Sequence, residues 1–347
     1  MTDHPYKELP SKAFWRKSVA DLAIAEVDPV GQFGLRISQA TKVATAGSCF
    51  AQHISASLSA QGFNFFVTEN ASPLAAEEAA RRQYGVFSAR YGNLYTARQL
   101  VQLFDRAYDR FRPVDDHWVR DDGRLVDPFR PQVEPDGFSS LEDLTRARSE
   151  HFAAVREMFE SLDVFVFTLG LTEAWRSRID GAVYPLAPGI VAGQMDAARY
   201  EFVNFGVSEV SSDMQSFLAR LRNVNTSARF IVTVSPVPLI ATFEDRHVLV
   251  STTLSKSVLR TAADEITRGD PLSDYFPSYE IITGNHSRGA YFEKDLRSVA
   301  PAGVHHVMRL FFSHFAAAES TSLLADEIAH ESAGVREIIC DEEAIDK

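Results

Sequence analysis

Cysteine is scarce in this sequence: the chain of 347 residues contains two, Cys49 and Cys340. Two cysteines exclude a disulfide framework and a zinc site built from cysteines. The sequence also has no run of about 18 apolar residues, the length that a membrane-spanning helix needs. Its polar first residues do not form the apolar segment of a secretory signal. We therefore expect a cytoplasmic protein without a membrane partner.

An excess of positive charge is missing as well. Lysine and arginine number 35 against 47 aspartates and glutamates, which gives a net charge of −12. This balance argues against nucleic acid as a partner, because binding to phosphates requires a basic face. Gly47 and Ser48 lack the further glycines and the lysine of a phosphate-binding loop. We also expect no metal site, since the adjacent His305 and His306 would diverge by about 100° on a helix.

Alternating strand and helix patterns dominate what the sequence does contain. Strands are predicted where apolar and β-branched residues form short runs, at 43–46, 63–67, 164–169, 230–234 and 279–283. Amphipathic helices are predicted between and after them, at 49–61, 207–223, 250–267 and 302–330. This order favours a three-layer α/β/α architecture with a doubly wound, mostly parallel sheet of five strands.

The same patterns suggest how the chain is divided. We expect an N-terminal lead-in at 1–40, a single α/β domain at 41–330 and a C-terminal tail at 331–347. Inside the domain, an insertion at about 70–160 is predicted to carry helices at 74–83, 96–108 and 140–161. Its segment 110–138 is rich in proline, aspartate, arginine and glycine. A loop this long is uncommon unless it is functional, so we expect a lid or a wall of a substrate site.

Open α/β sheets bind ligands beyond the carboxyl ends of their strands. Polar or glycine-containing segments stand at four of the predicted ends, at 47–48, at 170–173, at 235–236 and after Thr283. Their convergence predicts a site at this edge of the sheet.

Ser48 is the central candidate at that edge, because backbone N–H groups at a helix start favour a developing negative charge. It is a nucleophile if a base lies within reach, and otherwise an N-cap. Cys49 competes with it, because a helix N-terminus lowers a thiol pKa, unless it is simply a small buried residue. His53 leans back toward Ser48 from the next helical turn. It is a candidate base or oxyanion donor, with a structural role as the alternative.

Two further pairs are weaker candidates. Thr172 and Glu173 follow the most apolar strand and offer a hydroxyl and a carboxylate, or else they begin a helix. Gly92 and Asn93 form a tight turn before a helix that Thr96 would cap. Neither pair indicates a function by itself.

The segment 47–51, Gly-Ser-Cys-Phe-Ala, resembles the signature of the GSCFA family, which is related to the SGNH (GDSL-like) hydrolases. Further segments resemble that family in the same order, at 91–96, 168–175, 235–239, 255–260 and 275–280. The resemblance extends over roughly 35–315 and implies an SGNH-like, flavodoxin-like fold.

The SGNH relationship implies that Ser48 is the nucleophile and that its own N–H is one oxyanion donor. It implies a second donor at Gly92, with Asn93 beside it in the same block. The third donor is usually an asparagine, and here Thr172 stands in its place, followed by Glu173.

The last SGNH block is usually Asp-x-x-His and completes the catalytic triad. In this chain Asp295 is present, but Ser298 stands where the histidine belongs. The base must then come from elsewhere, and the candidates in order are His53, His306 and His286.

The resemblance therefore implies a serine esterase or an O-acyltransferase that acts on an acylated, carbohydrate-like substrate. Trp175, Tyr275 and Tyr279 lie near strand ends, where they would stack on sugar rings or serve the core. No cofactor is required, and a coenzyme A thioester is left open as the acyl donor. Two other functions stay open: a non-catalytic ligand- or glycan-binding protein, which the missing histidine motivates, and chemistry at Cys49.

Overall fold

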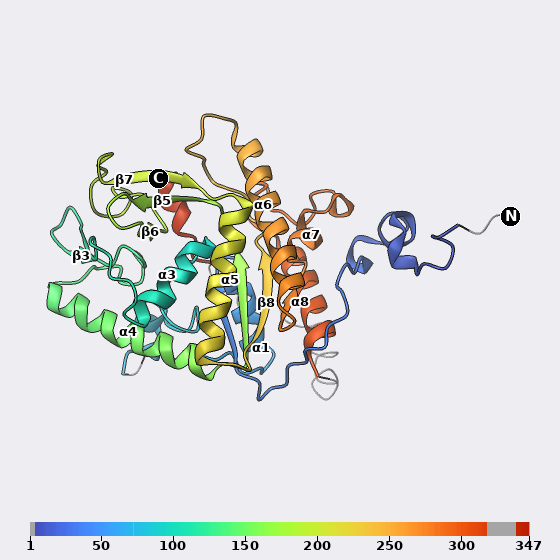
Figure 1. Ribbon diagram of the computed structural model, residues 1–347, viewed down its shortest axis with the longest axis horizontal. Helices are drawn as coiled ribbons and strands as arrows, with labels where there is room; N and C mark the ends of the chain where they lie inside the picture. The colour runs from blue at the N-terminus through green and yellow to red at the C-terminus, as the bar shows by residue number, and fades with distance from the viewer. Residues whose placement is uncertain (1–3, 72, 318–337, 347) are drawn as a thin grey trace.

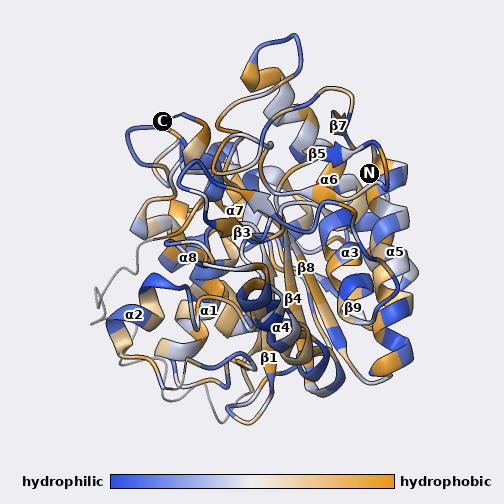
Figure 2. Ribbon diagram, turned by 90° about the vertical axis from the view of Figure 1, so that its left-hand side faces the viewer, coloured by the Kyte–Doolittle hydropathy of each residue, from blue (hydrophilic) through white to orange (hydrophobic). Residues whose placement is uncertain are grey.

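The computed structural model describes residues 4–71, 73–317 and 338–346. Its centre is a parallel sheet whose strands are hydrogen-bonded in the order β1 (Val43–Gly47), β4 (Val164–Leu169), β8 (Arg229–Val234) and β9 (Ser273–Tyr275). Figure 2 shows the apolar strands β4 and β8 enclosed by helices with polar outer faces. The predicted α/β fold with a mostly parallel sheet is thereby confirmed.

The expected fifth strand at 63–67 is reduced to one parallel bridge, between Val43 and Phe65. This bridge lies on the side of β1 that β4 leaves open. Counted with it, the chain-order numbers of the strands run 2-1-3-4-5 across the sheet. In sheets of this order, one connection leads to one side of the first strand and the next leads to its other side. The strand order therefore reverses between β1 and β4. Their carboxyl ends form the crevice in which a ligand is expected.

The strand predicted at 279–283 is wrong, because this segment forms helix α7 (Ser278–Thr283). Ile281 and Ile282 are both buried, and two consecutive buried residues suit a helix face better than the alternation of a strand. The last strand of the sheet is β9, which pairs with Phe230–Val232 of β8. Local β-propensity was overridden by packing, as often happens in short apolar runs.

Helices cover both faces of the sheet (Figure 1). Phe165 and Phe167 of β4 face one helix layer, made of α3 (Ala97–Ala107), α4 (Leu141–Ser161), α5 (Val207–Val224) and α6 (Val248–Gly269). Val164 and Val166 face the other layer, made of α1 (Ala51–Ala60), α7 and α8 (Pro301–Phe315). Alternate side chains of one strand therefore enter two separate cores. The helix predicted at 302–330 is α8 in part, and 318–330 lies outside the described residues.

The insertion holds α2 (Ala76–Arg81), α3 and α4, and a hairpin of β2 (Trp118–Val119) and β3 (Leu125–Val126). Directly after β4 comes a second, antiparallel sheet that the sequence did not predict, in the order β6 (Val183–Tyr184), β5 (Glu173–Ser177) and β7 (Tyr200–Asn204). Trp118 of the hairpin packs against Tyr184 and Tyr200 of this sheet. The predicted loop at 110–138 therefore packs on this second sheet, and its role as a lid or a wall of a substrate site stays a prediction.

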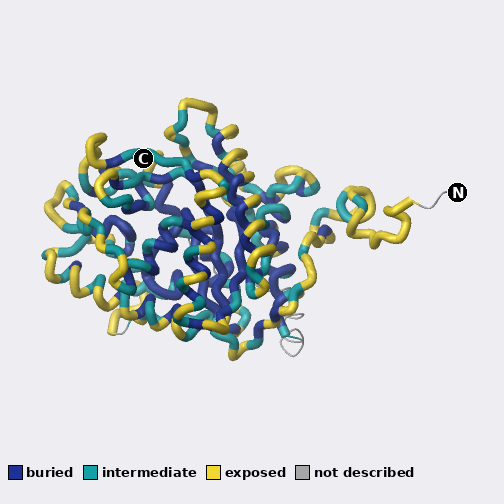
Figure 3. Tube along the Cα trace, in the orientation of Figure 1, coloured by how far each residue is buried: buried dark blue, intermediate teal, exposed yellow. Residues whose placement is uncertain are grey.

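The N-terminal segment lies largely exposed beside the body of the protein (Figure 3). It contains short helical turns at Ser11–Ala13, Arg16–Ala20 and Ile24–Glu26, and similar turns occur later at Asn285–Ser287 and Asp341–Ile345. Ile37 joins the segment to the domain through a bridge to Ala316. Across the described residues, we find no helix with the length and apolarity needed to cross a bilayer.

Gly47 ends β1 with a φ of +135° and pairs with Thr168 of β4. A Cβ atom at this position would lie 2.3 Å from the Thr168 carbonyl oxygen. We predict that Gly47→Ala lowers the free energy of unfolding by more than about 3 kcal/mol, because backbone strain adds to a clash with main-chain atoms. Gly269→Ala is the matched control, since a Cβ there meets nothing within 4 Å. Chemical denaturation of the two variants measures both, and equal stabilities would contradict the prediction.

Candidate active site

Ser48 lies at the crevice between β1 and β4, directly after Gly47. Its N–H donates to the carbonyl of Thr168 at 3.1 Å, and its carbonyl accepts from the N–H of Ala51 at 2.9 Å. The predicted N-cap role is wrong: the residue that caps α1 is Phe50. The Ser48 hydroxyl is buried, with the residue 2% exposed, and has no hydrogen-bond partner among the described residues.

Gly170, the first residue after β4, touches Ser48 across the crevice. A Cβ atom on Gly170 would lie 2.9 Å from the Ser48 Cβ, so only glycine fits. The N–H groups of Gly170 and Leu171 both donate to the carbonyl of Tyr95, at 2.9 and 3.0 Å. The chain segments that contain Ser48, Tyr95 and Gly170 therefore meet beside the Ser48 side chain.

Lys256 enters the same corner from α6. Its ammonium donates to the carbonyl of Gly170 at 2.7 Å, and the residue is only 1% exposed. Burial lowers the pKa of Lys256 to about 8, because the charged form loses its hydration. A lysine with such a pKa is partly neutral near pH 8 and can then accept a proton.

Asn93 forms the opposite side of the site. Its amide nitrogen donates to the carbonyl of Ile339 at 3.1 Å and to the Asp341 carboxylate at 3.0 Å. The backbone N–H of Asn93 donates to the same carboxylate. The N–H of Leu94 donates to the carbonyl of Gly47 at 2.8 Å, which fastens this loop to the end of β1. The neighbouring Gly92 has a φ of +70° and supplies the turn that the sequence predicted.

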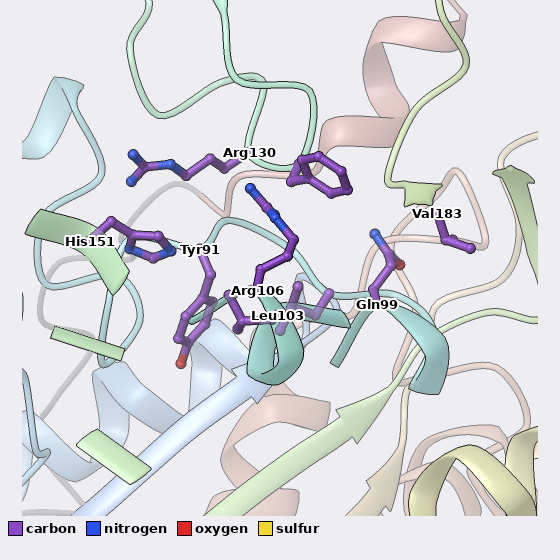
Figure 4. A pocket seen from close by; sticks show the side chains of 9 residues that line it. Tyr91, Gln99, Leu103, Arg106, Arg130, His151 and Val183 are labelled. Atoms are coloured by element: carbon purple, nitrogen blue, oxygen red, sulfur yellow. The ribbon is translucent and has the colours of Figure 1, made fainter. Parts of the chain in front are cut away.

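A buried cluster of charged side chains contacts the chain that leads to Asn93. Asp127 lies within 3.8 Å of Arg106, 3.2 Å of Arg130 and 3.4 Å of Arg148. Figure 4 shows Arg106 and Arg130 gathered with His151 around Tyr91, at a cavity of about 10 Å³. Arg130 also donates to the carbonyl of Arg90 at 3.3 Å, two residues before Gly92. The insertion therefore fixes the chain that presents Asn93.

The C-terminal segment 338–346 covers the site. Its Asp341 carboxylate accepts the hydrogen bond from Asn93 described above. Its Glu342 carboxylate accepts a hydrogen bond from the Arg297 guanidinium at 3.0 Å. Burial raises the pKa of Asp341 to about 7 and that of Glu342 to about 8, because a carboxylate loses its hydration there. The Asp341 N–H donates to the Tyr95 hydroxyl at 3.0 Å. The chain end thus returns to the carboxyl edge of the sheet, as Figure 1 also shows.

The three candidate histidines make their described contacts with residues other than Ser48. His53 packs edge-on against Phe50, with ring centroids 5.3 Å apart, and burial lowers its pKa to about 4. His306 hydrogen-bonds the Tyr291 hydroxyl at 2.6 Å, and burial lowers its pKa to about 4 as well. His286 is half-buried near His306, and burial lowers its pKa too. Within the described residues, none of them hydrogen-bonds Ser48.

Two other predicted residues serve the structure around the site. Thr172 donates its hydroxyl to the Asn204 side chain at 2.6 Å and its N–H to Ser255 at 3.1 Å. Glu173 begins β5 and accepts a hydrogen bond from the Thr242 hydroxyl at 2.7 Å. Thr172 and Glu173 thus join the second sheet to the main one.

Asp295 and Tyr279, the last two predicted residues, make their described contacts with residues other than Ser48. Asp295 is exposed and accepts from the Ser298 hydroxyl at 2.6 Å and from the N–H groups of Arg297 and Ser298 at 3.0 and 2.9 Å. It shapes the turn that carries Arg297. Tyr279 is packed against the core on the α6 side of the sheet.

The sequence interpretation missed Lys256, Arg297 and the C-terminal segment. Lys256 carried a signal, because it lies on the apolar face of a helix at the spacing of Leu259 and Ala263. Arg297 stood inside a block already recognised, next to Ser298. The C-terminal segment gave no local signal, since its contacts are made far away along the chain.

The described residues contain no group of three side chains suited to hold a metal ion. A groove of about 640 Å³ lies on the insertion and is lined by charged residues that include Glu69, Arg82 and Glu134. This groove and the small cavity at Tyr91 are both distinct from the Ser48 site.

The profile of the GSCFA family matches residues 42–311. This stretch contains Ser48, Asn93, Gly170, Lys256 and Arg297, and the segment 338–346 follows it. No curated protein matches the chain.

The charge cluster predicts an acid-sensitive fold. The pKa of Asp127 lies well below its usual range, because the charges of Arg148, Arg106 and Arg130 outweigh the burial that opposes them. The pKa of Glu69 is lowered to about 2 against its burial, chiefly by His151 and Arg130. Depressed carboxyl pKa values stabilise the fold above the unfolded-state pKa, and this stability is lost as pH falls. We expect the free energy of unfolding to decline between about pH 5 and pH 2.

Asp127→Asn removes one carboxylate of this cluster and leaves its guanidinium groups buried. We expect a loss of about 3 kcal/mol at neutral pH and a shallower decline in acid. Asp122→Asn, in an exposed ion pair with Arg120, is the control and should change little. Urea titrations from neutral to acid pH measure both variants, and similar losses would contradict the assignment.

Proposed function

The chain belongs to the GSCFA family, and on that premise we propose that it transfers acyl groups through a Ser48 acyl-enzyme, as an esterase or an O-acyltransferase. One observation carries the proposal: the Ser48 hydroxyl is buried at the reversal point of the sheet without a hydrogen-bond partner among the described residues. A buried polar atom without a partner is costly, and the hydroxyls of Thr45 in β1 and Thr168 in β4 share this state with Ser48. It is explained if a substrate supplies the missing contact.

Lys256 is the base that we propose for Ser48 in place of the histidine. Among the described residues, no hydrogen bond joins the two; the proposal rests on the bond from the Lys256 ammonium to the carbonyl of Gly170, the residue packed against Ser48, and on the lowered pKa of the lysine. Its neutral form takes the proton while the Ser48 oxygen attacks the acyl carbonyl, as in serine–lysine variants of the catalytic triad. The same ammonium then returns the proton to the leaving oxygen of an ester or the leaving sulfur of a thioester. In the second half, water or a sugar hydroxyl gives its proton to Lys256 and attacks the acyl carbonyl, and Lys256 returns that proton to the Ser48 oxygen as its bond to the acyl group breaks. The acyl donor is an ester or a coenzyme A thioester.

Asn93 is suited to bind the negative oxygen that forms during each attack. Its side-chain and backbone N–H groups both point at one carboxylate in the structure. Donors already oriented toward an anion stabilise developing negative charge without reorganisation. In the structure the Asn93 donors are engaged with Ile339 and Asp341 of the C-terminal segment, which a substrate would have to displace. The Ser48 N–H is instead held by the main-chain carbonyl of Thr168 in β4.

A carbohydrate-like substrate is supported by aromatic residues beside the site. Phe243 is 68% exposed and packs against Trp175 and Phe202, with ring centroids 4.9 and 5.4 Å apart. Trp175 lies in β5, which begins three residues after Gly170. An exposed ring such as that of Phe243, with half-buried aromatic rings behind it, can stack on the apolar face of a sugar ring.

A non-catalytic ligand- or glycan-binding function is the second candidate. It is favoured by Asp295 and Ser298, which bond each other in an exposed turn instead of forming the acid and base of a triad. In that function the crevice would keep the binding residues and lack turnover.

A fluorophosphonate probe distinguishes the two, because it reacts only with an activated serine. We predict that it labels Ser48, that the rate rises as pH passes through about 8, and that Ser48→Ala abolishes labelling. The rise follows from the sign of the shift, since Lys256 becomes neutral above its lowered pKa. Lys256→Arg keeps a positive charge but cannot act as a base, and we expect at least about a 100-fold slower reaction.

His53→Gln is the matched control for Lys256→Arg and should keep the wild-type rate, because His53 packs against Phe50 and does not hydrogen-bond Ser48. A normal rate in Lys256→Arg, or a large loss in His53→Gln, would remove Lys256 from its role. If a folded wild-type protein gave no labelling between about pH 6 and pH 9, the acyl-enzyme would be excluded and the binding function favoured.

A further inference from the structure

The two cysteines of the chain meet at the candidate active site. Cys49 lies beside Ser48, and Cys340 lies in the C-terminal segment, yet the two thiols lie close enough for each to shift the pKa of the other. Both residues are buried and both are free thiols. In a chain with only these two cysteines, such a meeting needs a specific arrangement.

Main-chain and side-chain bonds hold the two thiols in place on either side. The Gln52 side chain accepts from the Ile339 N–H at 3.0 Å and donates to the Ile339 carbonyl at 2.6 Å. Gln52 is one helical turn after Cys49, and Ile339 directly precedes Cys340. On the other side of Cys340, the Asp341 N–H donates to the Tyr95 hydroxyl. Cys340 is therefore fixed against Cys49 by bonds that do not involve sulfur.

The surroundings make the two thiols chemically unequal. The Arg297 guanidinium lies 3.4 Å from the Cys340 sulfur. The neighbouring Cys49 thiol and this cation both lower the pKa of Cys340, whereas the pKa of Cys49 is raised by Cys340 and by burial. A thiolate beside a cation is the more easily oxidised sulfur. The pair thus resembles a reactive cysteine with a resolving cysteine beside it.

We propose that Cys49 and Cys340 are a redox pair whose disulfide fastens the C-terminal segment over Ser48. The oxidant is a hydroperoxide. The Cys340 thiolate attacks one peroxide oxygen, which yields a sulfenic acid and, after protonation, one water from hydrogen peroxide. The Cys49 sulfur then attacks the Cys340 sulfur, and the hydroxyl leaves with a proton as a second water. Two thiols are oxidised by two electrons, and one peroxide is reduced.

The disulfide would hold the C-terminal segment in place under conditions in which ionisation of its carboxyl groups weakens its contacts. Asp341 and Glu342 have raised pKa values in the covered state, so their ionisation at higher pH weakens the contact of the segment with the site. A covalent bond one residue before Asp341 keeps these carboxyl groups in place at any pH. The redox pair does not depend on the proposed function, whereas its effect on Ser48 rests on it.

The pair itself is tested on the full chain, reduced and then treated with hydrogen peroxide. We expect both free thiols to disappear together and a linked peptide that contains Cys49 and Cys340 to appear, lighter than its reduced parts by two hydrogens. Dithiothreitol should restore both thiols. Arg297→Gln should form the disulfide about tenfold more slowly, because its Cys340 thiolate loses a cation. Separate oxidation of each cysteine, or a disulfide between two chains, would overturn the proposal.

Hydrogen exchange of the backbone amides in 339–345 measures whether the disulfide holds the C-terminal segment in place. We expect exchange at least about tenfold slower in the oxidised protein, with no such change in Cys49→Ser or Cys340→Ser. Fluorophosphonate labelling of Ser48 should fall by about the same factor and recover on reduction. A disulfide that leaves exchange unchanged would overturn the fastening. A disulfide that slows exchange, in a protein never labelled at Ser48, would leave the redox pair standing and exclude the acyl-enzyme.

Discussion

The contact between the ends of β1 and β4 is the constraint on which the site depends. Gly47 pairs with Thr168 and tolerates no Cβ, and Gly170 leaves room for Ser48 on the other side. Two glycines therefore let two strand ends approach so closely that a hydroxyl, a lysine and an asparagine loop share one corner. Larger residues at either position would separate the strands and disperse these groups.

Burial decides the chemistry of that corner more than any single ion pair does. The same loss of hydration that holds Lys256 partly neutral also favours the protonated forms of Asp341 and Glu342. The charge of Lys256 and the contact of the C-terminal segment with its neighbours therefore respond to pH in the same range. Charges deeper in the insertion, around Asp127, are instead fully paired and serve to hold the Asn93 loop.

The replacement of the usual triad histidine has a structural counterpart. Ser298 bonds Asp295, and the turn that they form directs Arg297 toward Glu342 and Cys340. The turn at Asp295 therefore supports the contact of the segment 338–346 with Arg297.

The sequence by itself determined the layered α/β fold, the helices α3 to α6 and the position of Ser48, because apolar periodicity and glycine at strand ends are local properties. It also pointed to the Asn93 turn. The tertiary structure was needed to show that α7 is a helix, that no histidine of the described residues hydrogen-bonds Ser48, that Lys256 bonds the Gly170 carbonyl, and that Arg297 bonds the C-terminal segment. These outcomes depend on contacts between residues far apart in the chain, and no local pattern encodes which distant partner a side chain will meet.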